Sequence, residues 1–152
     1  MKKKVISAIL CGAMVLGTVC PVLAADDKSE DTKTEAAGNS AEGKKIALVG
    51  KAAGNAFFEI AAKSFQETVE AEGGEVQVVY PETATADAQI KVLDNLISQD
   101  FDAICISAND VNALQAKLEE AMDEGIKVSS FDSAPNKDSR EIFVNQAGTK
   151  EV

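Results

Sequence analysis

Histidine is absent from the 152 residues of this chain, as is tryptophan, and Arg140 is the one arginine. Without histidine, a Ser-His-Asp triad, a Cys-His pair and every histidine-containing metal site are excluded. The phosphate-binding patterns G-x-x-x-x-G-K-[ST] and G-x-G-x-x-G are absent as well. These absences argue against an enzyme built on a nucleotide-binding sheet, and we expect neither a metal nor a cofactor.

Positive charge is scarce. Lysine and arginine number 15 against 25 aspartates and glutamates, which gives a formal net charge of −10. Binding to phosphate groups requires clustered lysine and arginine side chains. The composition therefore argues against nucleic acid and anionic membrane surfaces as partners.

Cysteine is also rare, with Cys11 and Cys20 near the N-terminus and Cys105 inside an apolar run. If the chain is cleaved after Ala24, one cysteine remains and no disulfide can form within the chain. Cys105 is then expected to be a small buried apolar residue. Cys20 has a second interpretation as a lipidated residue at the mature N-terminus, although residues 17–19 match a lipobox poorly.

Residues 1–24 have the pattern of an export signal. Residues 2–4 are lysines, and residues 5–19 form an apolar run that is too short to span a bilayer but long enough for a signal peptide. Small residues around Ala24 suit cleavage, which would take the formal charge from −10 to −13 by removing three lysines. We expect export to the periplasm or the outer face of the cell membrane; the alternative is an N-terminal membrane anchor.

Residues 25–43 are expected to form a disordered acidic linker. They are small, polar or charged, with no aromatic or large aliphatic side chain. Such a segment cannot bury enough apolar surface to offset the entropy of ordering it. A solvated spacer suits a domain held away from a membrane or wall, and an ordinary disordered leader is equally compatible.

Residues 44–152 alternate between two kinds of hydrophobic pattern. A continuous apolar run predicts a strand at residues 46–49, and hydrophobic segments predict three more at 76–80, 101–107 and 126–131 and a shorter fifth strand at 141–145. Between them, apolar residues at helical spacing predict three helices, whose stripes begin at Phe58, Ile90 and Leu114. Asn55 and Thr85 are suitable N-caps for the first two helices, and Asn109 or Asp110 for the third.

This order of elements predicts an α/β fold with a doubly wound parallel sheet and right-handed crossovers. The expected strand order is 2-1-3-4, with a short fifth strand whose place in the sheet is left open. In such a sheet a ligand binds past the carboxyl ends of the strands, where the first and third strands lie side by side. Polar residues that follow the first, third and fourth strands should therefore converge.

Candidate binding residues follow the first strand. Lys51 can donate hydrogen bonds to ligand oxygens, although it could equally be an ordinary surface lysine. Asn55 most simply caps the helix, and its amide could also bind a sugar hydroxyl. Phe57 and Phe58 are adjacent and cannot both face the core. Phe58 fits the core stripe, which leaves Phe57 to pack against the apolar face of a ligand.

A second group follows the later strands. Asp132 and Ser133 follow the fourth strand, where the carboxylate could accept hydrogen bonds from a ligand or belong to an ordinary turn. Asn109 follows the third strand with the same ambiguity, and there capping is favoured. Asn145 and Gln146 close the last apolar run and are weaker candidates.

Taken together, these segments resemble the sugar-type substrate-binding proteins of ABC importers, the type 1 periplasmic-binding-protein family. The similarity is greatest to the rhamnose and autoinducer-2 binding branch. It is carried by a lysine after the first strand, the Phe57-Phe58 pair, and the aromatic-Asp-Ser sequence of residues 131–133. The matching segments are residues 45–50, 51–58, 104–110, 125–128, 131–133 and 145–146.

The resemblance covers residues 44–152 and corresponds to about the first third of a family member. It implies the N-terminal lobe of a two-lobed protein that closes on its ligand by hinge motion, with the second lobe absent from this sequence. It implies that Lys51 and Asp132 hydrogen-bond the ligand and that Phe57 or Phe58 forms a wall. The residues expected at the ligand are Lys51, Asn55, Phe57, Phe58, Asn109, Asp132 and Ser133.

We therefore expect an exported, monomeric solute-binding protein that captures a small sugar or sugar-like ligand of the rhamnose or autoinducer-2 type. Its partner would be an ABC permease in the membrane, and it would catalyse no reaction. The alternative is a sensory receptor domain on the same fold, which would report its ligand to a kinase or chemoreceptor.

Overall fold

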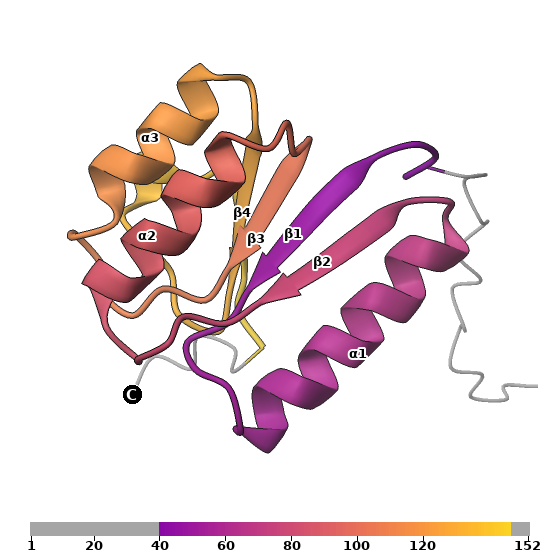
Figure 1. The fold of residues 1–152 in the computed structure, drawn as a ribbon, viewed down its shortest axis with the longest axis horizontal. Helices are drawn as coiled ribbons and strands as arrows, with labels where there is room; N and C mark the ends of the chain where they lie inside the picture. The colour runs from indigo at the N-terminus through magenta and orange to yellow at the C-terminus, as the bar shows by residue number, and fades with distance from the viewer. Residues whose placement is uncertain (1–39, 147–152) are drawn as a thin grey trace, which may run out of the picture. The chain divides into compact units, whose positions relative to one another are not determined.

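Five parallel strands form a single sheet with helices on both faces in the computed structural model, which describes residues 40–146 (Figure 1). The strands are β1 (Lys45–Val49), β2 (Glu75–Val79), β3 (Ala103–Ile106), β4 (Lys127–Phe131) and β5 (Ile142–Val144). The helices are α1 (Ala56–Ala71), α2 (Ala86–Ile97), α3 (Gln115–Asp123) and the short 3-10 helix η1 (Lys137–Ser139). The expected signal segment 1–24, Cys20 and the linker up to residue 39 lie outside the described residues.

The strand order is β2-β1-β3-β4-β5, with every neighbouring pair parallel. This confirms the predicted order 2-1-3-4 and the short fifth strand. β1 pairs with β3 so that Val49 lies opposite Ile106 at their carboxyl ends. The chain thus has its topological switch point between these two strands, where ligands of such sheets bind.

Helices cover both faces of the central strands β1 and β3, which explains why the buried parts of these two strands are apolar without alternation. Ala47 and Val49 pack with the leucines of α2 and α3 on one face. On the other face, Leu48 and Cys105 pack with Ala62 of α1. Cys105 is buried as expected, and burial raises the pKa of its thiol, which keeps it neutral.

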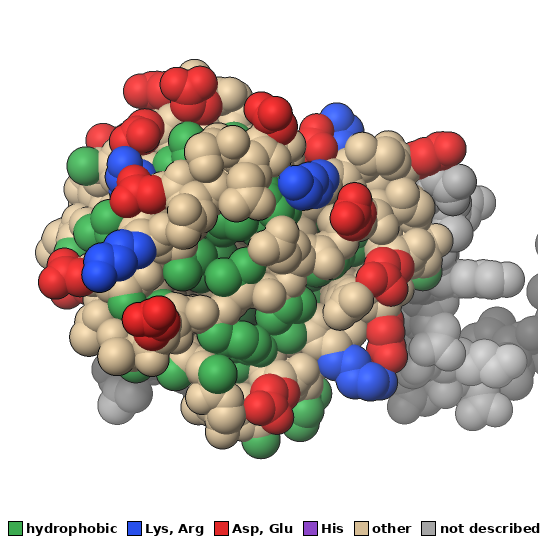
Figure 2. Space-filling model, viewed as in Figure 1, with side chains coloured by type: hydrophobic (Ala, Val, Ile, Leu, Met, Phe, Trp, Pro, Cys, Tyr) green, Lys and Arg blue, Asp and Glu red, His purple; other side chains and the backbone are tan. Residues whose placement is uncertain are grey.

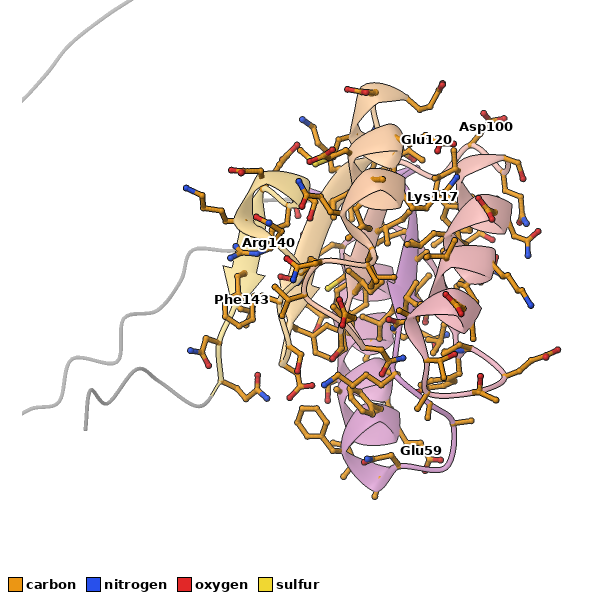
Figure 3. All side chains as sticks on the ribbon, turned by 90° about the vertical axis from the view of Figure 1, so that its left-hand side faces the viewer. Glu59, Asp100, Lys117, Glu120, Arg140 and Phe143 are labelled. Atoms are coloured by element: carbon orange, nitrogen blue, oxygen red, sulfur yellow. The ribbon has the colours of Figure 1, made fainter. Side chains whose placement is uncertain are left out.

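Charged side chains lie on the outer surfaces of the helices. Lys117 of α3 lies 2.7 Å from Asp94 of α2 and 2.7 Å from Glu120, and so joins the two helices that cover one face (Figure 3). On the face seen in Figure 2, acidic side chains are spread among neutral ones, as the negative net charge predicts. Within residues 40–146, no helix combines the length and the hydropathy needed to cross a membrane.

The first two helices begin where their capping residues predict. The Oδ1 atom of Asn55 accepts a hydrogen bond from the backbone N of Phe57 at 3.0 Å. The hydroxyl of Thr85 accepts one from the backbone N of Ala88 at 3.3 Å. Both caps are confirmed, because each side chain satisfies an amide that has no partner within the helix.

The third helix begins later than predicted, and the assignment of Asn109 or Asp110 as its N-cap is wrong. Its N-cap is Leu114, which makes no side-chain capping bond. Asp110 instead accepts from the backbone N of Asn112 at 2.8 Å and of Ala113 at 2.7 Å. The carboxylate therefore caps a separate turn before the helix, and the side chain of Leu114 at the helix start is buried in the core.

The lobe includes residues that the sequence assigns to the end of the linker. The backbone N of Ala41 donates to the carbonyl of Glu72, and that of Gly43 donates to the carbonyl of Gly73. Ala41 is 8% exposed. Its small side chain packs beside Gly74, where an added Cβ would lie 3.0 Å from that of Ala41. The packed structure therefore starts before residue 44.

A close contact between Gly50 and Tyr80 shapes the carboxyl edge of the sheet. A Cβ atom at position 50 would lie 2.4 Å from a ring carbon of Tyr80. The Tyr80 hydroxyl donates to the carbonyl of Phe58 at 3.2 Å and so connects the end of β2 with α1. Glycine at position 50 gives the ring the room that this connection needs.

We predict that Gly50→Ala displaces the Tyr80 ring and lowers the free energy of unfolding by about 1–3 kcal/mol, since added volume in a packed site forces side chains from their positions. Urea denaturation followed by circular dichroism measures this. In the Tyr80→Ala background the same change should cost much less, because the clash has gone. Equal costs in both backgrounds would contradict the steric explanation.

Candidate functional site

Side chains from three strand ends meet at the carboxyl edge of the sheet. The Nζ atom of Lys51, after β1, lies 3.3 Å from Oδ2 of Asp132 and donates to the Ser133 hydroxyl at 2.5 Å. The hydroxyl of Ser107, after β3, donates to the same Asp132 oxygen at 2.8 Å. We call Lys51, Ser107, Asp132 and Ser133 the carboxyl-edge cluster. Three of its members are predicted site residues: Lys51, and the adjacent Asp132 and Ser133, which lie about 80 residues further along the chain.

The backbone of Asp132 allows two consecutive side chains to reach Lys51. Its φ angle is +59°, in the left-handed region, which aspartate adopts more readily than most residues. In an extended strand, successive side chains point to opposite faces of the sheet. The left-handed residue ends that alternation. The carbonyl of Ser133 then accepts from the backbone N of Ala108 at 2.9 Å, which holds this turn against the segment after β3.

The Asp132 carboxylate is ionised at neutral pH. Partial burial alone would raise its pKa, but hydrogen bonds from Ser107, Lys51 and Gln146 and the positive charge of Lys51 together lower the pKa below its usual value. The Gln146 amide donates to the other carboxylate oxygen at 3.2 Å. The Lys51 and Asp132 side chains are 28% and 26% exposed, so a ligand can still reach both.

Asn109 lies beside this cluster without capping a helix. Its side-chain amide donates to the carbonyl of Lys51 at 3.3 Å, and its backbone N donates to Oε1 of Gln89 at 2.8 Å. The structure thus brings Asn109 to Lys51, as the predicted site requires.

Two further residues of this region, Gln89 and Ser107, were missed by sequence reasoning. Gln89 occupies an inward position in the same stripe as Leu93 and Leu96, where a polar residue signals a buried hydrogen-bonded site. Ser107 closes the buried run of β3 in a similar way.

An aromatic group flanks the polar cluster. Phe58 is 7% exposed, and its ring packs edge-to-face against Phe131 with centroids 6.1 Å apart. Phe57 is 43% exposed and packs edge-to-face against Phe58 at 5.1 Å. The expected division, with Phe58 in the core and Phe57 at the surface, matches these positions. Among residues 40–146, Asn55 makes no hydrogen bond to Lys51 or Asp132, so its contact is with the helix it caps.

A hollow of about 570 Å³ lies away from the carboxyl-edge cluster. It is at the opposite, amino-terminal edge of the sheet, next to Phe101 and Gly125. Two of the charged groups beside it, Lys44 and Asp102, pair with each other at 2.8 Å. The carboxyl edge remains the better candidate for the ligand site. A site that lies between two walls shows no enclosed cavity when only one of the walls is present. Across the part of the chain that the structure describes, no three histidine, cysteine, aspartate or glutamate side chains are grouped to hold a metal ion.

The lowered pKa of Asp132 leads to a prediction about stability. A carboxylate with a depressed folded-state pKa stabilises the fold above its unfolded-state pKa of about 3.9, and this contribution is lost as the pH falls through the lower value. Asp132→Asn should therefore reduce the free energy of unfolding at neutral pH by about 1 kcal/mol. The difference from wild type should shrink below about pH 4.

Denaturant titrations from neutral to acidic pH measure that difference. Asparagine tolerates the left-handed backbone, so the change is mainly one of charge. Asp100→Asn is a matched control, because Asp100 also has a positive φ, of +53°, and its side chain is exposed. If the effect of Asp132→Asn does not depend on pH, the lowered pKa of Asp132 is contradicted.

Solved structures with a similar fold come from transport systems. A solute-binding protein of an ABC transporter from Clostridium phytofermentas, solved with bound L-rhamnose, is 44% identical with a TM-score of 0.69; the match covers 71% of this chain and 34% of that one. LsrB from Clostridium saccharobutylicum, in complex with AI-2, is 32% identical with a TM-score of 0.63, covering 67% and 31%. A solute-binding protein from Burkholderia graminis, in complex with D-arabinose, is 28% identical with a TM-score of 0.64, covering 68% and 35%.

This chain therefore spans about a third of the length of these solved relatives. Residues 46–152 match the family model described as a periplasmic binding protein domain. That match covers well over half of the chain, and it agrees with the strand order and with the resemblance carried by the residues after β1 and β4. The chain belongs to the periplasmic binding protein family.

Proposed function

We propose that residues 44–152 form one wall of a sugar-binding site in an exported solute-binding protein of an ABC importer. The observation that carries this proposal is the carboxyl-edge cluster at the switch point between β1 and β3. There the Lys51 ammonium group lies 3.3 Å from the Asp132 carboxylate, and both are partly exposed. The protein would bind its ligand and release it to a membrane permease without making or breaking a covalent bond.

The chemistry of the cluster suits a polyhydroxylated ligand. A sugar hydroxyl both donates and accepts hydrogen bonds, so one hydroxyl can accept from Lys51 while it donates to Asp132. The present Lys51–Asp132 distance of 3.3 Å exceeds the length of about 2.7–2.9 Å that is usual for a strong charge-assisted hydrogen bond. Hydroxyl groups inserted beside this pair would therefore gain better contacts than the pair makes alone.

The neighbouring aromatic side chains favour a ligand with one apolar face. Phe57 is half-exposed beside Phe58, whose ring contacts Phe131 at the end of β4. An aromatic ring packs well against the C–H face or the methyl group of a deoxy sugar. The relatives solved with L-rhamnose and AI-2 support a ligand of this kind.

A second lobe would supply the opposite wall. The solved relatives are about three times as long as the part matched here, and we propose that their additional length provides that lobe. Residues 1–24 would direct export, residues 25–39 would connect the lobe to the mature N-terminus, and the protein would act as a monomer. With one wall only, the 152-residue chain should bind weakly, because half the contacts and the exclusion of water are missing.

Weak binding can be measured directly by NMR. We predict that titration of the ¹⁵N-labelled chain with L-rhamnose shifts the backbone amides of Lys51, Asn109, Asp132 and Ser133, with a dissociation constant in the millimolar range. Lys51→Met should reduce these shifts strongly, since it removes the only cation in the cluster.

A matched lysine provides the control for this titration. Lys127 lies at the opposite edge of the sheet and pairs with Glu141 at 3.0 Å, so Lys127→Met should leave the titration unchanged. Shifts confined to the amino-terminal edge, or no shift with L-rhamnose, ribose or AI-2, would remove the proposed site. Micromolar affinity of the isolated chain would contradict the need for a second wall.

A further inference from the structure

Gln89 lies near the start of α2 and is fully buried, with 0% of its surface exposed. It shares the inward stripe of this helix with Leu93 and Leu96, where leucine would continue the apolar pattern. Burying an amide costs free energy unless its polar atoms are hydrogen-bonded. The presence of glutamine at this position therefore calls for partners that an apolar side chain could not satisfy.

The Gln89 amide uses its two donors and its acceptor on three backbone groups. Its Nε2 atom donates to the carbonyl of Gly50 at 3.1 Å and to that of Ser107 at 2.8 Å. Its Oε1 atom accepts from the backbone N of Asn109 at 2.8 Å. These groups lie just past β1 and β3, where the paired residues of the two strands end at Val49 and Ile106. Gly50 and Ser107 are themselves buried, so bulk solvent does not reach the carbonyl groups that Gln89 satisfies.

Each of the three bonded residues adjoins the carboxyl-edge cluster. Gly50 directly precedes Lys51, the hydroxyl of Ser107 donates to Asp132, and the side chain of Asn109 donates to the carbonyl of Lys51. One side chain thus bonds both to the segment that carries the lysine and to the segment that supports the carboxylate.

We propose that Gln89 is a positioning residue of the ligand site, which holds the segments after β1 and β3 in the arrangement that a ligand meets without touching the ligand itself. The expected effect of Gln89 on ligand binding rests on the proposed function. The expected effect of Gln89 on the position of the two segments does not depend on a ligand. Glutamine fits the role because it offers two donors and an acceptor from one planar group. Methionine has a similar size and offers none of these bonds.

The test compares Gln89→Met with wild type in the ¹⁵N-labelled 152-residue chain. Without ligand, the Asn109 amide should exchange with solvent at least roughly tenfold faster in the variant, since its acceptor is gone. With L-rhamnose as the probe, the dissociation constant should rise roughly tenfold, because the polar groups are no longer preorganised.

Leu96→Ala is the matched control for lost stability. Leu96 lies on the same helix, is 2% exposed and packs in the core. Its apolar side chain forms no hydrogen bonds. This variant should lower global stability while leaving the Asn109 exchange rate, corrected for that loss, and the rhamnose titration close to wild type. If Gln89→Met and Leu96→Ala change both readouts equally, Gln89 is merely structural and the inference is overturned.

The remaining outcomes separate the two hypotheses. If wild type does not respond to rhamnose but Asn109 loses protection in Gln89→Met, the proposed function fails and the positioning of the two segments stands. If rhamnose binds wild type and Gln89→Met alike, the inference fails and the proposed function stands.

Should Gln89→Met not fold, the wild-type protein still decides. Both side-chain amide protons of Gln89 should exchange slowly and shift on addition of rhamnose, whereas those of Gln77 and Gln99, which are exposed, should do neither. Fast exchange of the Gln89 protons would overturn the inference.

Discussion

The parallel pairing of β1 with β3 is the constraint on which the rest of this lobe depends. It places Val49 opposite Ile106, so that the two chains leave the sheet side by side. Because both faces of the sheet are covered, the first residues past the strands are still buried and their backbone groups need partners inside the protein. Gln89 meets that need for Gly50 and Ser107. The polar residues that follow can then face solvent from a fixed base.

The same constraint explains why the polar cluster is satisfied within the lobe. Lys51 contacts Asp132 and Ser133, and Asp132 also accepts from Ser107 and Gln146. Within residues 40–146, no buried side-chain nitrogen or oxygen lacks a hydrogen-bond partner. A site of this kind keeps its shape without a ligand, which lowers the entropy lost on binding. Its groups remain accessible because the ion pair is only partly buried.

Much of the fold could be predicted from the sequence because its signals are local. Each of these signals depends on residues that are close in the sequence. They are the hydrophobic segments of β1 to β4, the helical stripes, and the caps at Asn55 and Thr85. The meeting of Lys51 with Asp132 could also be predicted, since the strand order follows from a general rule for doubly wound sheets. The role of Gln89 could not be predicted. Its partners lie 39, 18 and 20 residues away, and they are backbone groups, which every residue has and which therefore give no signal in the sequence. The start of α3 was misplaced because Asp110 caps a turn that precedes the helix, and the sequence does not distinguish such a turn from a first helical turn.

The left-handed backbone at Asp132 limits how the proposed binding wall could be redesigned. Few side chains accept a φ of +59° without strain, so glycine, asparagine and aspartate are the practical choices there. Of these, aspartate alone carries a charge to balance Lys51. An altered ligand preference would therefore have to be introduced at the flanking aromatic and amide positions, or by rebuilding the whole turn. The geometry of a single peptide unit thus restricts the range of ligands that point mutations in this lobe could recruit.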